Sequence, residues 1–322
     1  MRNGTSVICP TSDRTMKERV LLFDIMKAFC VVEIVAFWHM LDYTPYAFTK
    51  GTLGEELTGV VLAAFTFSSG FFLGKKQLNA LAFYNSRLKR FMLPLLASLL
   101  TFYVFGQISL RTVCFTAIGL SCFIPPMPNT LWFFSMIIFF YWITPVLLCG
   151  LYNMTPLTRI MNIVIRSTML FMVIVLLGVD ERIREYYPFY ILGIVMDMSI
   201  IKTIIEMKPT YKIGGVVLWL LSAYVEGLSF VTNMLGCMLL LILSYLIEQH
   251  LSQKGRNFFL RLSYASMFAY LFHREFYAIT KLMCAQPNGT LPVWSIAATI
   301  LVIFLLSYYM QKCYDWIMAR FS

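Results

Sequence analysis

Residues 17–42, KERVLLFDIMKAFCVVEIVAFWHMLD, form a stretch long enough to cross a lipid bilayer as a helix. Four ionisable side chains interrupt this otherwise apolar run: Asp24, Lys27, Glu33 and His39. Each such group at membrane depth costs about 3 kcal/mol on insertion scales. A segment that keeps four of them is expected to use them, and the rest of the chain is interpreted as what surrounds this segment.

The composition of the whole chain indicates a membrane protein. Of its 322 residues, 59% are hydrophobic and 13% are charged, and the mean hydropathy is +0.74. A soluble domain is roughly half apolar and a quarter charged. We therefore expect an all-α, polytopic integral membrane protein with about ten transmembrane helices. The net charge of +10 fits basic cytoplasmic loops beside membrane lipid, and no nucleic-acid partner is expected.

The distribution of basic residues sets the expected topology. With the N-terminus inside, 19 of the 26 Lys and Arg residues fall on the inner side, six fall on the outer side, and Lys27 lies within the first span. Both termini are therefore expected in the cytoplasm, and the protein in the cell inner membrane. A further run, 112–124, is too short to span and is expected at an interface or as a re-entrant segment. The expected spans are 20–41, 57–74, 91–107, 131–149, 160–178, 186–204, 212–226, 228–247, 262–283 and 292–311.

We expect a single membrane domain at 20–312, with a cytoplasmic leader at 1–19 and a cytoplasmic tail at 313–322. Residues 1–16 are polar, so no cleavable signal peptide is expected. The eight Cys residues contain no CxxC pair, so neither a disulfide framework nor a metal site is expected. The oligomeric state stays open.

The ionisable residues of the first span point in different directions on a regular helix. Lys27 and His39 are 12 positions apart, which is about 18 Å, with Lys27 toward the cytoplasm. Asp24 and Lys27 are close enough to pair, whereas Lys27, Glu33 and His39 point three separate ways. His39 is a candidate general base because free imidazole titrates near neutrality. The alternatives are an interfacial histidine beside Trp38 and a structural Asp24–Lys27 ion pair.

The inner loop 75–90, KKQLNALAFYNSRLKR, contains a candidate anion site. Arg87 and Arg90 lie at the expected start of the third span, where free N–H groups and the helix dipole favour anions. Two Arg side chains there can clamp a phosphate, and Pro94 suits a first helical turn. Binding of lipid head groups is the simpler alternative.

Three further stretches carry candidate residues. The small residues of 68–72, SSGFF, allow close approach of a helix or a ligand. Trp132 opens the fourth span and belongs either to an aromatic belt or to a site. His273, within 263–277, SYASMFAYLFHREFY, could meet His39 at a similar depth or mark the end of a shortened span.

These stretches occur in an order that resembles the acyltransferase 3 family of integral-membrane O-acetylases. Members carry D-x-x-[RK] and a later His in the first span, then S-G-F, R-x-x-R with a Pro, W-F, Y-P-F-x-x-x-G and Y-L-x-H. The similarity covers about 20 to 312, and the Lys of the first motif resembles the subgroup with D-I-x-K. The matching residues are Asp24 to Lys27 with His39, Ser69 to Phe71, Arg87 to Arg90 with Pro94, Trp132-Phe133, Tyr187 to Phe189 with Gly193, and Tyr270 to His273.

The resemblance implies an O-acyltransferase that moves an acetyl group from cytoplasmic acetyl-CoA to a hydroxyl of a cell-envelope carbohydrate, often lipid-linked. It also implies His39 as the essential histidine. We add Asp24 and Glu33 as catalytic candidates because a carboxylate can orient a histidine. The candidate ligands of acetyl-CoA are Lys27, Ser69, Arg87 and Arg90, and the candidate substrate ligands are Trp132, Tyr270 and His273.

One departure from the family pattern generates a structural prediction. The family usually places the cationic residue and the His 11 positions apart, about 20° on a regular helix. Here the separation is 12. We predict a π-bulge between 28 and 38 that absorbs the extra residue, since on a straight helix Lys27 and His39 would not act together. Glu33 is a candidate partner of His39, of Lys27 or of a substrate hydroxyl.

A non-enzymatic alternative is a transporter of a lipid-linked sugar or small solute. In that case Asp24, Lys27, Glu33 and His39 would form an intramembrane relay. The chain shows no internal repeat, which argues mildly against it. A family member that keeps the fold without the chemistry is a third reading. The acceptor, the acyl chain length and direct versus covalent transfer through His39 stay open.

Overall fold

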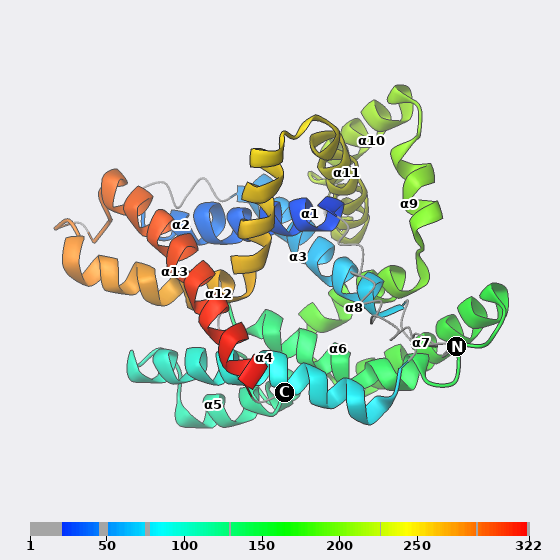
Figure 1. Ribbon diagram of the computed structural model, residues 1–322, viewed down its shortest axis with the longest axis horizontal. Helices are drawn as coiled ribbons and strands as arrows, with labels where there is room; N and C mark the ends of the chain where they lie inside the picture. Colours follow the sequence, from blue (N-terminus) through cyan, green and yellow to red (C-terminus); the bar gives the residue numbers. More distant parts are fainter. Residues whose placement is uncertain are drawn as a thin grey trace, which may run out of the picture.

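The chain folds into helices throughout the part that the computed structural model describes (Figure 1). No strand occurs in these ranges. The expected leader, 1–19, lies outside them. The described residues are 21–44, 51–74, 78–128, 130–225, 227–287 and 289–320.

The first expected span is one continuous helix with a change of type in its middle. It consists of α1 (Leu21–Val32), a π-helical segment (Glu33–Trp38) and α2 (His39–Leu41). The other helices are α3 (Gly51–Gly74), α4 (Ala80–Val104), α5 (Leu110–Ala117), a 3-10 helix (Leu120–Cys122), α6 (Trp132–Leu148), α7 (Pro156–Leu176), α8 (Glu181–Val195), α9 (Met198–Ile205), α10 (Pro209–Ser222), α11 (Ser229–His250), α12 (Gln253–Cys284) and α13 (Val293–Arg320).

Polar side chains start six of these helices. Each accepts a hydrogen bond from a backbone N–H of the first turn, which would otherwise have no partner. The capping residues are Asn79 for α4, Ser109 for α5, Thr155 for α7, Asp180 for α8, Asp197 for α9 and Ser252 for α12.

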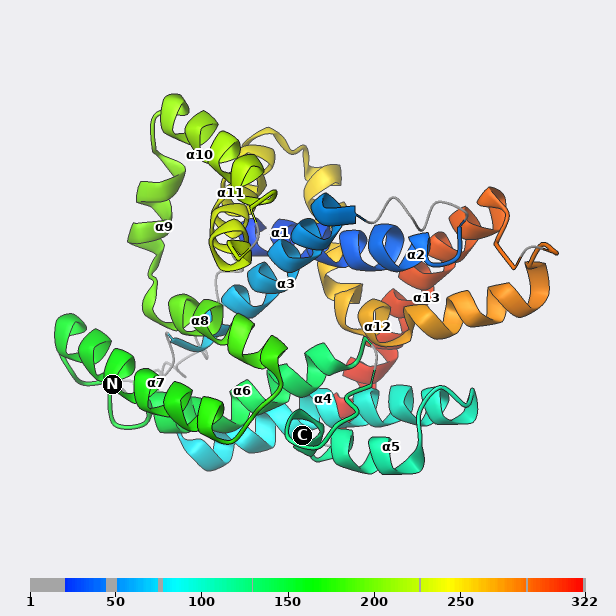
Figure 2. The same ribbon diagram turned by 180° about the vertical axis from the view of Figure 1, so that it is seen from behind.

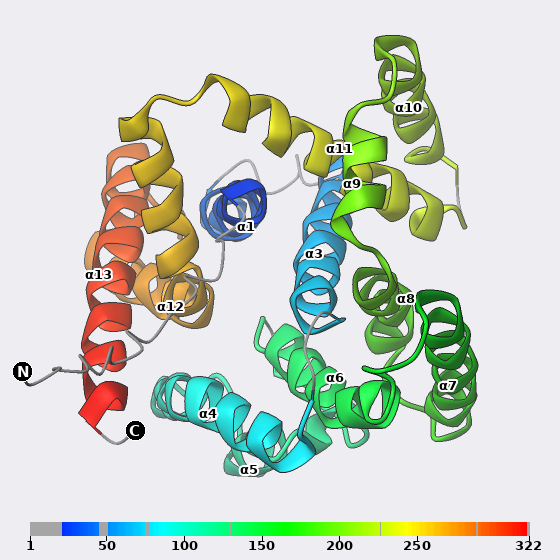
Figure 3. The same ribbon diagram turned by 45° about the vertical axis from the view of Figure 1, so that its right-hand side comes forward.

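The first helix lies inside the bundle. Helix α1 is packed between α12 on one side and α3 with α11 on the other (Figure 3). Helices α4 to α7 form a group beneath them, and α9 and α10 project away from this group beside α11 (Figures 1 and 2). The seam between α1 and α3 is aromatic, because Phe23 contacts the rings of Phe67, Phe71 and Phe72. The helix that carries the ionisable residues is therefore buried.

Glycines allow α3 and α8 to pack backbone to backbone. A Cβ atom at Gly70 would lie 2.1 Å from the carbonyl oxygen of Tyr190, and one at Gly193 would lie 2.1 Å from that of Phe67. Gly74, four residues after Gly70, meets Ile194 in the same way. This is a small-xxx-small contact of the kind that brings membrane helices together. The S-G-F and Y-P-F-x-x-x-G stretches thus form two sides of one helix crossing.

Four described helices are long and apolar enough to cross a membrane, which makes the chain a multi-pass membrane protein. They are Leu53–Gly74, Pro156–Leu176, Ser229–His250 and Val293–Arg320. A fifth results if α8 and α9 form one bent span. The count of ten spans and the cytoplasmic position of both termini stay predictions.

The expected single span at 186–204 is wrong as a straight helix. Helix α8 ends at Val195 and α9 begins at Met198, with a bend of 103° between them. The reason is local, because the Asp197 carboxylate accepts hydrogen bonds from the backbone N–H groups of Ser199 and Ile200. A new helix starts there inside the apolar run.

The expected loop at 75–90 and the third span also need correction. Helix α4 begins at Ala80, so Arg87 and Arg90 lie two to three turns inside a helix and not at its N-terminus. Pro94 likewise lies within α4 and not in its first turn. The run 112–124 contains only α5 and a 3-10 turn, so the prediction that it is too short to span is confirmed. Residues 313–320 continue α13.

Candidate functional site

The helix that carries His39 changes its hydrogen-bonding pattern where the sequence predicts it. Residues Glu33–Trp38 are π-helical. Because a π turn holds one residue more than an α turn, the 12 positions from Lys27 to His39 advance as 11 would on a regular helix. The two residues are then about 20° apart on the helix. The predicted bulge between 28 and 38 is confirmed.

A tyrosine of α12 holds this bulge. The change from i−4 to i−5 bonds frees a backbone carbonyl in the turn, and the hydroxyl of Tyr277 donates to the carbonyl of Val35 at 3.0 Å. Tyr277 is fully buried, and its ring stacks on Tyr43 with centroids 4.9 Å apart. Tyr277 is four residues after His273, on the same face of α12. One face of α12 thus carries both Tyr277, which contacts the π-bulge, and His273.

His273 meets His39 as the sequence suggested. Nε2 of His273 lies 2.9 Å from Nδ1 of His39, and the ring centroids are 4.8 Å apart. Both side chains are buried, with 0% and 8% exposure respectively. The pair joins the C-terminal end of the first helix to the middle of α12.

The partners of His273 determine which nitrogens carry protons. Its Nδ1 faces the carbonyl oxygens of Tyr270 at 2.8 Å and Ala269 at 3.2 Å. Carbonyl oxygens only accept hydrogen bonds, so Nδ1 of His273 is protonated. In the neutral ring its Nε2 then accepts from the Nδ1–H of His39. In this tautomer of neutral His39 the lone pair lies on Nε2, the arrangement that a general base requires.

Tyr270 contacts the ring of His273. Its hydroxyl donates to the carbonyl of Thr130 at 2.9 Å, and its ring meets that of His273 at 5.9 Å between centroids. Phe133 and Phe134 pack on its other sides. Tyr270 was predicted as a substrate ligand, and its observed contacts orient His273.

The two predicted carboxylates contact hydroxyls of neighbouring helices. Asp24 accepts a hydrogen bond from the hydroxyl of Ser263 on α12, about 20 Å along the helix from His39. Glu33 accepts from Thr58 of α3 at 3.1 Å. These contacts tie α1 to its two neighbours, and the catalytic assignment of Asp24 and Glu33 stays a prediction.

Lys27 and Ser69 share the seam between α1 and α3. Nζ of Lys27 lies 4.7 Å from the centroid of the Phe72 ring, a cation–π contact. Ser69 is one turn before Phe72, and its hydroxyl donates to the carbonyl of Phe65 in its own helix. Lys27 thus contacts α3 one turn after Ser69, and the assignment of both residues as acetyl-CoA ligands stays a prediction.

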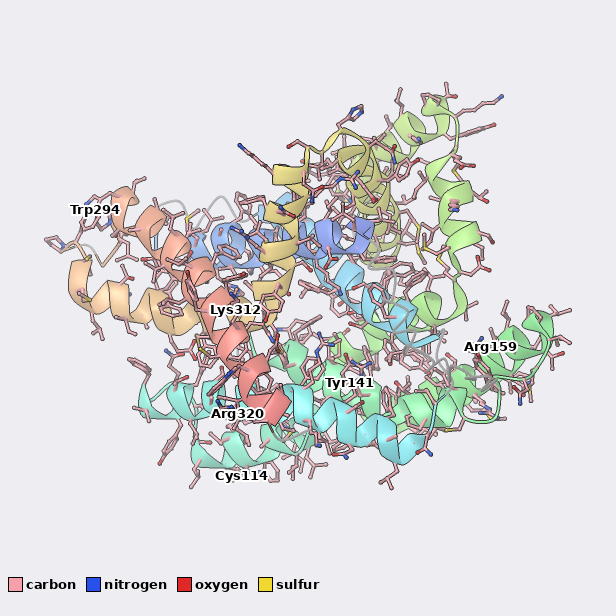
Figure 4. All side chains as sticks on the ribbon, viewed as in Figure 1. Cys114, Tyr141, Arg159, Trp294, Lys312 and Arg320 are labelled. Atoms are coloured by element: carbon pink, nitrogen blue, oxygen red, sulfur yellow. The ribbon has the colours of Figure 1, made fainter. Side chains whose placement is uncertain are left out.

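Arg87 lines a cavity of about 300 Å³ between α4 and α6. Its guanidinium lies 5.4 Å from the centroid of the Phe83 ring and 5.2 Å from the centroid of the Tyr141 ring. Tyr141 is labelled in Figure 4, where α6 lies beside α4. Nε of Arg87 is buried and has no hydrogen-bond partner. Arg90, the other predicted ligand, is exposed beside Phe91. A buried donor of this kind suits an anionic ligand.

Trp132 belongs to a cluster at the outer end of α6 and α8. The guanidinium of Arg182 lies 4.7 Å above its ring, and Tyr186 packs against it with centroids 6.0 Å apart. Arg182 also pairs with Asp180. Hydrogen bonding from Arg182 lowers the pKa of the Asp180 carboxyl from its ordinary value. The predicted substrate ligand is thus covered on one face by Arg182.

Sequence reasoning did not assign roles to Tyr277 and Glu275. The signal for Tyr277 was its spacing of four residues from His273. Glu275 is 4% exposed and accepts a hydrogen bond from Thr101 of α4 at 2.8 Å. An ionisable residue inside an apolar helix is the same signal that drew attention to the first span.

The comparison with protein families gives one match that covers most of the chain. A family model described as an acyltransferase domain, of the acyltransferase 3 type, matches residues 21–312. No curated protein and no solved structure shows significant similarity. The matched range contains every side chain described above.

Proposed function

The chain belongs to the acyltransferase 3 family, and from this premise we propose that it is an O-acyltransferase that moves an acetyl group from acetyl-CoA to a hydroxyl of a cell-envelope carbohydrate, lipid-linked or free, at the inner membrane. The family supports acyl transfer in a membrane. The donor, the ester product and the carbohydrate class are the proposal.

The arrangement of His39 and His273 is the observation that carries the proposal. Backbone carbonyls fix the tautomer of His273 and, through it, that of His39. A buried third group that orients a catalytic base is the logic of nucleophile-activating sites in general. Here the orienting group is neutral, so it fixes direction without adding charge to the membrane interior.

The proposed chemistry balances with the residues present. Nε2 of His39 takes the proton of the acceptor hydroxyl while the oxygen of that hydroxyl attacks the carbonyl carbon of the thioester. A C–O bond forms and the C–S bond breaks. The proton on His39 then passes to the departing thiolate. Acetyl-CoA supplies only the activated acyl group, and His39 returns to its starting tautomer because His273 cannot change its own.

The donor would enter from the side of Arg87. The buried Nε of Arg87 and the exposed guanidinium of Arg90 offer charged donors to the phosphates of CoA. The N-terminus of α4 does not contribute to this proposed donor site, because α4 begins at Ala80, seven residues before Arg87. Lys27 and Ser69 would line the path of the acyl arm toward His39.

The test compares two histidines of the same chain. Membranes with His39→Ala are expected to lose transfer of labelled acetyl from acetyl-CoA to glycan, by about 10²-fold or more for the loss of a general base. The matched control is His250→Ala, because His250 is exposed at the end of α11. Both variants should be present in the membrane at the wild-type level. Full transfer with His39→Ala would refute the proposal.

A second measurement addresses the donor site. Binding of acetyl-CoA to the purified protein should weaken with Arg87→Ala together with Arg90→Ala. The control is Arg111→Ala, because Arg111 is exposed on α5, on the expected outer side. Unchanged binding would remove Arg87 and Arg90 from the donor site. The acyl content of the glycan with and without the gene identifies the acceptor.

A further inference from the structure

A second cavity lies near the N-terminal ends of α3, α8 and α11, which are their expected outer ends. Its volume is about 240 Å³, room for about eight water molecules at their share of liquid volume. Trp38, the residue before His39, forms part of its wall. Glu55 and Ser229 line it and are exposed, so the cavity opens toward the expected outer side.

Carboxylates dominate the polar lining of this cavity. Glu55 and Glu56 come from α3, and Glu185 comes from α8. Glu185 and Glu56 lie close enough to interact electrostatically, across the two helices. Among the described residues, no Lys or Arg belongs to the lining, and Arg182 of the same helix is paired with Asp180. Three carboxylates in a partly buried cavity repel one another unless a bound cation compensates their charge or protonation removes part of it.

A buried amide also points to a ligand at this position. Asn233 of α11 lines the cavity and is 1% exposed. Its Nδ2 donates to Glu185 at 3.2 Å, while its Oδ1 is buried and has no hydrogen-bond partner. An acceptor left unsatisfied in a buried position costs about 1–3 kcal/mol. A donor on a bound molecule would remove that cost.

We infer that this cavity binds a protonated amino group of the acceptor, so that the acceptor is an amino-substituted carbohydrate. The inference rests on the proposed function and adds the substrate class. The carboxylates of Glu56 and Glu185 hold the ammonium group, and Asn233 accepts from it or from a neighbouring hydroxyl. The rings of Trp38 and Tyr186 provide aromatic surface beside it.

The chemistry of the bound group determines which atom of the acceptor reacts. An ammonium group held by carboxylates has no lone pair and cannot attack a thioester. The nucleophile is therefore a hydroxyl of the same acceptor, and the product is an ester. Among the described residues no three His, Cys, Asp or Glu side chains converge as ligands of a metal ion, which favours an organic cation in this cavity.

The test measures binding apart from catalysis. The purified full-length protein is titrated by calorimetry with methyl glucosaminide and with methyl glucoside, which differ only in an amine against a hydroxyl. The glucosaminide should bind about tenfold more tightly or better, as one charge-assisted contact implies. Glu56→Gln together with Glu185→Gln should abolish that preference while leaving the glucoside affinity unchanged. Glu181→Gln, exposed on α8 outside the lining, should keep it.

The outcomes separate the two proposals. Equal affinity for both glycosides, failure of the glucosaminide to bind, or binding of the glucoside that depends on added calcium would overturn the amine site. Selective binding without any acetyl transfer would retain the amine site and overturn the proposed function. Where transfer occurs, mild base should release the acetyl group as expected for an ester, and a base-resistant amide would overturn the assignment of the reacting group.

Discussion

A deletion within the π-bulge gives a quantitative test of helix phase. Removing Ala36 reduces the separation of Lys27 and His39 from 12 positions to 11 and allows a regular α-helix. The side chain of His39 then keeps its direction, and its displacement is at most about 1.5 Å along the axis. Inserting an alanine after Ala36 instead rotates His39 by about 100°. At a side-chain radius of about 5 to 6 Å, that rotation moves the ring by about 8 Å, far beyond the 2.9 Å contact with His273.

The two variants should therefore differ although both change the same turn. The deletion leaves the hydroxyl of Tyr277 without its bulge carbonyl, which costs about 1–3 kcal/mol of stability, and should keep at least about a tenth of the acyl-transfer activity. The insertion should reduce activity to background. Both are assayed in membranes with protein abundance measured in parallel. If the deletion is as inactive as the insertion at equal abundance, the phase argument is wrong.

Two further predictions concern stability. Gly193→Ala should reduce the amount of folded protein severalfold, because its Cβ would lie 2.1 Å from the carbonyl oxygen of Phe67. The control is Gly214→Ala, since a Cβ at Gly214 would have nothing within 4 Å, and it should leave the amount unchanged. Fluorescence-detected chromatography measures the folded amount of both variants. Arg182 lowers the pKa of Asp180, so the stability that this pair contributes is present above the unfolded-state pKa and is lost as pH falls through the folded-state pKa. Asp180→Asn should flatten the decrease in the thermal midpoint below about pH 4, by an amount worth less than about 1 kcal/mol because the pair is partly exposed.

The sequence supported the parts of the site that depend on helical phase. The 12-residue separation of Lys27 and His39 conflicts with a shared face, and the π-bulge resolves it. The depth of His273 within its apolar run likewise predicted its contact with His39. The first argument counts positions along one helix, and the second compares the depths of two residues in two helices. Both depend on the regular geometry of the helical backbone.

Helix ends were harder to predict than helix phase. An apolar run does not show where a helix starts, so Arg87 was placed at an N-terminus although Asn79 caps α4 further upstream. The bend before α9 was not predicted for the same reason. Its signal in the sequence is Asp197, which caps the N-terminus of α9. Contacts between distant segments, such as those of Asp24 and Glu33 with hydroxyls of other helices, cannot be derived from spacing on a single helix.

The two histidines form a proton path that ends inside the protein. On its Nδ1 side, the ring of His39 can pass a proton to His273, and the far nitrogen of His273 faces backbone carbonyls, which are far too weak as bases to carry it onward. A proton taken up at Nε2 of His39 therefore has no exit through His273. The pair can therefore exchange protons at Nε2 of His39 while the contact with His273 provides no onward route along α12.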